Sequence, residues 1–115
     1  MTTEYSGTLH GGKSFIINMA QFMQIFNSME NVLIGIYCNH TDTCISTQRF
    51  HLSKATMEVL EDTLEITEGM NSILLHSIER CPTNYEPPCE DNSQLYVFTI
   101  NTNRDYYYKI VADTK

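Results

Sequence analysis

Residues 7–14 (GTLHGGKS) match the phosphate-binding pattern G-x-x-x-x-G-K-[ST]. In such a site the loop joins a buried parallel strand to the start of a helix, so that backbone N–H groups, the lysine and the Ser/Thr hydroxyl converge on phosphates and Mg²⁺. A helix-like apolar period begins at Phe15, but residues 1–6 (MTTEYS) are not the Val/Ile/Leu run of a buried parallel strand. We interpret the match as a coincidence and keep nucleotide binding through Gly7–Ser14 as an alternative.

The cysteines form two pairs in the sequence, Cys38 with Cys44 and Cys81 with Cys89. His40 and His51 lie near the first pair, and zinc accepts Cys and His ligands tetrahedrally. The spacing matches none of the usual zinc knuckles, which place two ligands about two to four residues apart. Free thiols are favoured, because free Cys is among the most buried residue types. A disulfide in either pair and a zinc-stabilised domain remain alternatives.

A catalytic cysteine needs a histidine base and an orienting acid. Cys38, His40 and Asp42 are close in sequence, but triad members must converge in space from rigid elements. His10 and His76 are isolated, and no two carboxylates are recognisably placed for acid–base chemistry. We therefore predict no catalytic, cofactor-binding or metal-binding residues and expect a protein that is not an enzyme.

The formal net charge is −7, and residues 58–91 carry nine acids against a single base, Arg80. This balance disfavours direct DNA or RNA binding, which needs clustered Lys and Arg. The most regular acids, Glu58, Glu61 and Asp62, fit one face of a short helix, and Glu65 follows them. The simpler interpretation of these acids is a solvated face. The functional interpretation, which we carry forward, is a negative surface that imitates nucleic acid and binds a basic protein partner.

Tyr106, Tyr107 and Tyr108 lie on the last predicted strand, so aromatic side chains face both sides of the sheet. Exposed tyrosines are enriched at protein interfaces, while cross-strand packing against Tyr96 and Phe98 is the alternative. The candidate partner-binding residues are Glu58, Glu61, Asp62, Glu65, Tyr106, Tyr107 and Tyr108.

The elements that must position these side chains follow from hydrophobic periodicity and turn residues. We predict strands over 3–9, 32–37, 44–52, 94–101 and 106–111, a helix from Phe15 with Ser14 as its N-cap, and a short helix after Ser53. The alternating pattern and the turn residues over 63–78 predict a hairpin, with a helix over 70–80 as the alternative. The order β-α-β-β-α-β-β-β-β predicts one α+β domain over residues 1–115, with a mostly antiparallel sheet, two helices on one face and a C-terminal hairpin.

This element order resembles a ferredoxin-like unit with an added hairpin and, more loosely, part of a sliding-clamp subunit. Clamp helices face DNA and should be basic. Here the first predicted helix is almost uncharged and the second is acidic. We therefore assign the chain to no family.

No apolar signal region follows Met1, and no stretch approaches the ~18 apolar residues of a membrane span. The sequence predicts an intracellular protein, cytoplasmic or nuclear, that does not bind membranes. Its expected function is that of a small acidic interaction or regulatory module that binds another protein. Such chains are common among viral and phage accessory proteins, and a homodimer is a further expectation.

Overall fold

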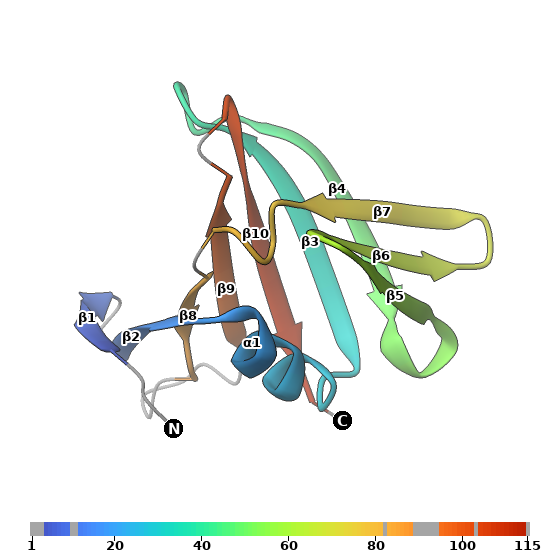
Figure 1. Ribbon diagram of the computed structural model, residues 1–115, viewed down its shortest axis with the longest axis horizontal. Helices are drawn as coiled ribbons and strands as arrows, with labels where there is room; N and C mark the ends of the chain where they lie inside the picture. Colours follow the sequence, from blue (N-terminus) through green and yellow to red (C-terminus); the bar gives the residue numbers. More distant parts are fainter. Residues whose placement is uncertain (1–3, 10–11, 82, 89–94, 103, 115) are drawn as a thin grey trace.

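The computed structural model describes residues 4–9, 12–81, 83–88, 95–102 and 104–114, with side chains described from Ser14 onward. In this part of the chain, ten strands form two antiparallel sheets beside one α-helix (Figure 1). The predicted α+β fold with two helices on one face is therefore wrong, because the protein is mostly β and forms one α-helix within the described residues.

The larger sheet contains seven strands in the order β1-β2-β8-β9-β10-β3-β4. Their bounds are β1 Glu4–Leu9, β2 Gly12–Ile17, β8 Thr83–Glu86, β9 Tyr96–Asn101, β10 Tyr106–Asp113, β3 Asn31–Cys38 and β4 Cys44–His51. The central ladder pairs β3 with β10, with Val32 opposite Ala112 and Cys38 opposite Tyr106. The predicted strands over 32–37 and 44–52 and the C-terminal hairpin are confirmed.

The smaller sheet contains β5 (Thr56–Leu60), β6 (Thr63–Glu68) and β7 (Asn71–His76), in that order. Two-residue turns connect these strands. Glu61 has φ 57° in the first turn and Gly69 has φ 62° in the second, where glycine adopts a positive φ without steric cost. The predicted hairpin over residues 63–78 is thus confirmed, and the alternative helix over 70–80 is wrong.

The single α-helix of the described residues, α1, spans Met19–Phe26 and begins later than predicted. Asn18 is its N-cap: the Asn18 side chain accepts from the Gln21 N–H at 2.8 Å, and the Gln21 side chain accepts from the Asn18 N–H at 3.0 Å. This reciprocal capping fixes the first turn. Ser14 instead lies in β2, because the apolar residues on either side of Asn18 belong to a strand and then to a helix.

The second predicted helix is also wrong. A 3₁₀ turn, η1 (Leu52–Lys54), is followed by strand β5. The spacing of Met57 and Leu60 fits a helical turn, but residues 56–60 also alternate. That alternation prevails because β5 pairs along its whole length with β6.

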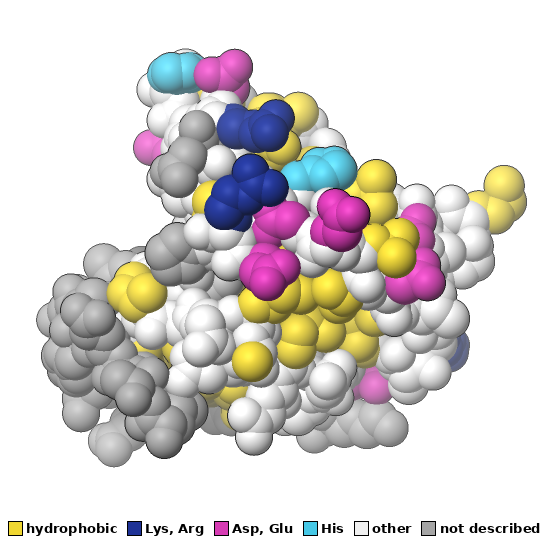
Figure 2. Space-filling view, viewed as in Figure 1, with side chains coloured by type: hydrophobic (Ala, Val, Ile, Leu, Met, Phe, Trp, Pro, Cys, Tyr) yellow, Lys and Arg dark blue, Asp and Glu magenta, His cyan; other side chains and the backbone are white. Residues whose placement is uncertain are grey.

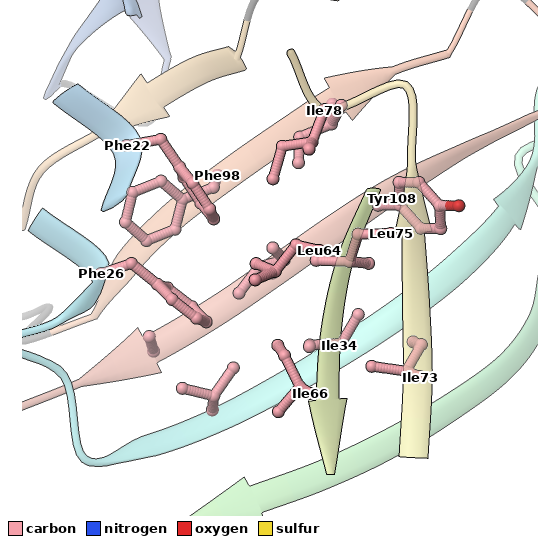
Figure 3. Close-up of a cluster of buried hydrophobic side chains, with 14 of the residues drawn as sticks. Phe22, Phe26, Ile34, Leu64, Ile66, Ile73, Leu75, Ile78, Phe98 and Tyr108 are labelled. Atoms are coloured by element: carbon pink, nitrogen blue, oxygen red, sulfur yellow. The ribbon is translucent and has the colours of Figure 1, made fainter. Parts of the chain in front are cut away.

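The hydrophobic core lies between one face of the large sheet and a layer formed by α1 and the small sheet. The rings of Phe22 and Phe26 pack on Phe98 of β9, with centroids 5.1 and 6.1 Å away in edge-to-face geometry. Figure 3 shows side chains of the small sheet pointing into the same cluster as Ile34 of β3 and Tyr108 of β10. We call this face of the large sheet the inner face.

Candidate binding groove

A hollow of about 430 Å³ lies between the edge of β7 and the inner face of the large sheet. Strand β7 crosses the large sheet partway along its length, and in Figure 1 no ribbon covers the inner face beyond it. We call this hollow the β7 groove and define it by Ile36, Ile45, Tyr106 and Tyr108 of the large sheet and Ser72 and Leu74 of β7.

The apolar surface of the β7 groove is partly open to solvent. Ile45 is 62% exposed, so it would gain from burial against a partner. Leu74 borders the groove with its backbone, because its side chain alternates with the buried Ile73 and Leu75 and lies on the other face of the small sheet. The β3–β4 ladder shifts register here, since Ile36 pairs with Ser46 while Tyr37 pairs with Cys44. Ile45 is the extra residue of this β-bulge and has no partner on β3. The bulge lets Ile45 line the hollow together with Ile36.

One edge of β7 carries backbone groups that pair with no strand of the described residues. The His76 N–H donates to the Tyr108 hydroxyl at 3.0 Å, and that hydroxyl lies 3.3 Å from the Leu74 carbonyl, to which it donates. The backbone groups of Leu74 and His76 therefore point away from β6. Backbone direction alternates along an antiparallel ladder, so Ser72 points the same way.

Charge distinguishes β7 from the other edge strands of the described sheets. Natural edge strands are blunted by charged residues, which discourage pairing with another chain. The sequences of β1, β4 and β5 contain Glu4, Arg49 and Glu58, respectively. Strand β7 reads NSILLH and contains no Lys, Arg, Asp or Glu. Among these edges, β7 is the one that charge does not protect.

The β5 edge borders a second exposed apolar area. Val59 is 43% exposed and Leu60 is 58% exposed. Figure 2 shows hydrophobic side chains gathered between α1 and the small sheet, with acidic side chains along the border. This area lies beside a strand that carries Glu58, in contrast to the uncharged β7.

The four predicted acidic residues do not share a helix face. Glu58 and Glu65 lie directly opposite each other on β5 and β6, and Leu74 of β7 lies opposite Glu65. These three side chains form a row on the face of the small sheet that points away from the core, which we call the acidic row. Opposed like charges destabilise a sheet, so the acidic row would be stabilised by a cation.

Glu61 and Asp62 form the β5–β6 turn instead, and Asp62 has a structural role. Its carboxylate accepts from the N–H groups of Glu79 and Arg80 at 2.7 and 2.9 Å and pairs with the Arg80 guanidinium at 2.9 Å. Desolvation alone would raise the pKa of Asp62. The pKa is nevertheless lowered, because the carboxylate accepts hydrogen bonds from the N–H groups of Arg80 and Glu79 and lies beside the Arg80 guanidinium. Asp62 therefore holds the chain that follows β7.

The three predicted tyrosines divide between the two faces of the large sheet. Tyr106 and Tyr108 line the β7 groove. Tyr107 lies on the opposite face, where its ring stacks on Tyr37 with centroids 5.4 Å apart and its hydroxyl donates to Asp42 at 3.1 Å. The Tyr37 ring lies over Gly35, where an added Cβ would come within 2.7 Å of it. Tyr107 therefore takes no part in the groove.

The proposed zinc ligands are not brought together. His40 lies 3.4 Å from Asp105, whereas His51 lies 3.3 Å from Glu68 at the other end of β4. Cys38 and Cys44 are free thiols. Within the described residues, no three His, Cys, Asp or Glu side chains are grouped in a way that could hold a metal ion. Cys89, of the second cysteine pair, lies outside the described residues.

Cys38, His40 and Asp42, which the sequence places close together, do not form a triad. His40 contacts Asp105 rather than Asp42, and Asp42 instead accepts the Tyr107 hydroxyl. A hydrogen bond from the Thr41 side chain, with smaller contributions from His40, lowers the pKa of the Cys38 thiol. His40 and Asp105 are 74% and 93% exposed, so no cleft encloses them.

The phosphate-loop pattern folds as a hairpin. Gly7 pairs with Ser14 and Leu9 pairs with Gly12 across β1 and β2, and β2 continues to Ile17. The segment therefore does not lead directly into a helix, as phosphate binding would require. His10 and Gly11 lie outside the described residues.

Comparisons with protein-family models, with curated proteins and with solved structures gave no match. The described residues contain no helix with the length and apolar character needed to cross a membrane.

Proposed function

We propose that this protein is a non-enzymatic interaction module that binds another protein through the β7 groove. The observation that carries this proposal is the open backbone edge of β7 beside an apolar hollow of about 430 Å³. An edge supplies hydrogen-bonding groups and a hollow supplies apolar surface, and a protein partner can use both at once.

The side chains of the groove support binding. Ile45 is exposed, whereas Tyr106 is half-buried and packs edge-to-face against Tyr108, with centroids 5.5 Å apart. Tyrosine fixed by such packing loses little conformational entropy on binding and is typical of interface hot spots. A central tyrosine with apolar neighbours is therefore a suitable anchor site.

The acidic row adds an electrostatic contribution. Glu58 and Glu65 form no ion pair within the described residues, and both lie on the sheet whose edge borders the groove. Their field would attract a partner with a basic surface and would speed association, an advantage that salt reduces. We infer that charge brings the partner near and that the groove holds it.

Quantitative capture of partners from a cell extract tests this function. Ile45→Lys places a charge in the groove, whereas Thr47→Lys places the same charge two residues away on the opposite face of β4. Partners captured by the original protein and by Thr47→Lys are expected to be lost with Ile45→Lys. Circular dichroism must show that both variants are folded. Equal capture by the two variants would refute the groove as the binding site.

A further inference from the structure

Resting on the proposed function, we propose that the partner contributes an extended segment that pairs with β7 as a fourth strand of the small sheet. Its apolar side chains would face the large sheet, and they would alternate with basic side chains that face the acidic row. Four observations support this partner chemistry.

The backbone of β7 is prepared for strand addition. The Tyr108 hydroxyl accepts from the His76 N–H and donates to the Leu74 carbonyl, as a peptide group of a neighbouring strand would. This contact occupies one end of the edge. At the other end, Ser72 offers its N–H and carbonyl and Leu74 offers its N–H. Pairing over these residues accommodates a segment of about five residues.

The side chains on one face of an added strand would meet the uncovered inner face of the large sheet. Ile36 and Ile45 lie there with Tyr106, in the same hollow as the β7 edge. Stacked sheets lie about 10 Å apart, so apolar side chains fill such a space. The added segment would therefore continue the sheet-on-sheet packing that already buries Ile73 and Leu75.

The side chains on the other face of the added strand would continue the acidic row. The order across the sheet is Glu58, Glu65, Leu74 and then the added residue. Neighbouring strands are about 4.8 Å apart, so Glu65 would lie roughly 10 Å from the new backbone. A lysine or arginine stem can cover Leu74 and bring its charge close to Glu65. The segment would thus supply the cation that the two glutamates lack.

Charge complementarity favours this partner over a second copy of the chain. Strand β7 has the sequence NSILLH, so pairing of β7 with β7 would bring no lysine or arginine to the acidic row. It would also bring together the acidic rows of two copies, which repel each other. We therefore propose a different chain with alternating apolar and basic residues.

The peptide acetyl-Val-Lys-Val-Lys-Val-amide is the probe. We expect NMR titration to give shifts centred on the β7 groove, and hydrogen exchange to show protection of the Ser72 and Leu74 amides. A peptide of the same composition with its lysines clustered at one end should bind at least about fivefold more weakly. N-methylation of one ladder residue removes a hydrogen bond and should weaken binding by about fivefold. Glu65→Gln should weaken it by about two- to threefold.

The outcomes separate this inference from the proposed function. Suppose that Ile45→Lys abolishes partner capture, but that clustering the lysines and N-methylating the peptide leave its binding unchanged. The groove would then remain the binding site, and strand pairing would be refuted. Protection of Met57 and Val59 instead would place the added strand on β5 and also refute it. Concentration-dependent dimers with Ser72 and Leu74 protected in the absence of peptide would identify a second copy as the occupant and overturn the inference. Because lysine clustering and N-methylation are changes to the peptide, misfolding of the protein cannot imitate their effect on binding.

Discussion

The inner face of the large sheet has a covered half and an uncovered half, and the same strands run through both. On β3, Ile34 is fully buried while Ile36, two residues further on the same face, is half-buried. On β10, Tyr108 is buried while Tyr106 is half-buried. The residue types hardly differ between the halves. What differs is the position of the small sheet, which turns one half into core and leaves the other half available for binding.

The largest expected effect is a difference in the free energy of unfolding between a substitution in the covered half and one in the uncovered half. Phe98→Ala removes a fully buried ring that contacts Phe22 and Phe26 and should lower the free energy of unfolding by about 3–5 kcal/mol. Ile45→Ala removes apolar atoms from the uncovered half and should change it by no more than about 0.5 kcal/mol. Urea denaturation followed by circular dichroism measures both. Similar losses would mean that Ile45 belongs to the core after all.

Tyr108 marks the boundary between the halves. Burial raises its pKa to about 12, and the protonated phenol donates to the Leu74 carbonyl. Tyr108→Phe should cost about 1 kcal/mol in the free energy of unfolding. It should also speed hydrogen exchange of the His76 amide. Tyr37→Phe, on the opposite face, is the control. Unchanged exchange at His76 would show that the hydroxyl does not hold this edge.

Acid should loosen the small sheet from the covered half. Glu68 accepts the His51 N–H at 2.7 Å, which with the nearby imidazole lowers the pKa of Glu68 from its ordinary value of 4.5. A lowered carboxyl pKa adds stability at pH above 4.5, and this stability is lost as the pH falls toward the folded-state pKa. Between about pH 6 and pH 3.5, the Tm of Glu68→Gln should therefore fall less than that of the original protein.

The matched control for this acid effect is Glu61→Gln, at an exposed turn position. Its Tm should follow that of the original protein as the pH falls. If Glu68→Gln and Glu61→Gln had the same pH profile, the contact between Glu68 and His51 would not stabilise the fold.

The smallest effect should be a gain in stability. Glu58→Gln removes one of two opposed carboxylates and should raise the free energy of unfolding by about 0.2–1 kcal/mol at low salt. Screening should reduce the gain at high salt. A loss of stability would indicate that Glu58 already has a stabilising partner in the folded protein. The acidic row would then not need a cation from a partner.

Much of the large sheet could be predicted from local patterns. The run VLIGIY over 32–37 identified β3, and turn residues between alternating segments identified the hairpins β6–β7 and β9–β10. The errors arose where one stretch fits two periods. Phe15 and Met19 have the spacing of one helical face, although Asn18 separates the strand from the helix. Met57 and Leu60 likewise fit a helix turn but lie in β5.

The groove could be predicted only in part. The tyrosine run indicated Tyr106 and Tyr108, because aromatic residues are common at interfaces. The contributions of Ile45 and Leu74 depend on a bulge and on where β7 crosses the large sheet, and neither follows from local sequence. The available signal was the uncharged run at 71–76, which becomes informative once the strand is known to be an edge.

The central ladder has a consequence for biosynthesis. Strand β3 pairs with residues 106–113, so one side of β3 has no native neighbour until that distant segment has left the ribosome. Such non-local pairing is intrinsically slow, and an unpaired apolar strand invites aggregation in the meantime. We therefore expect β3 to stay prone to aggregation until residues 106–113 have been synthesised and can pair with it.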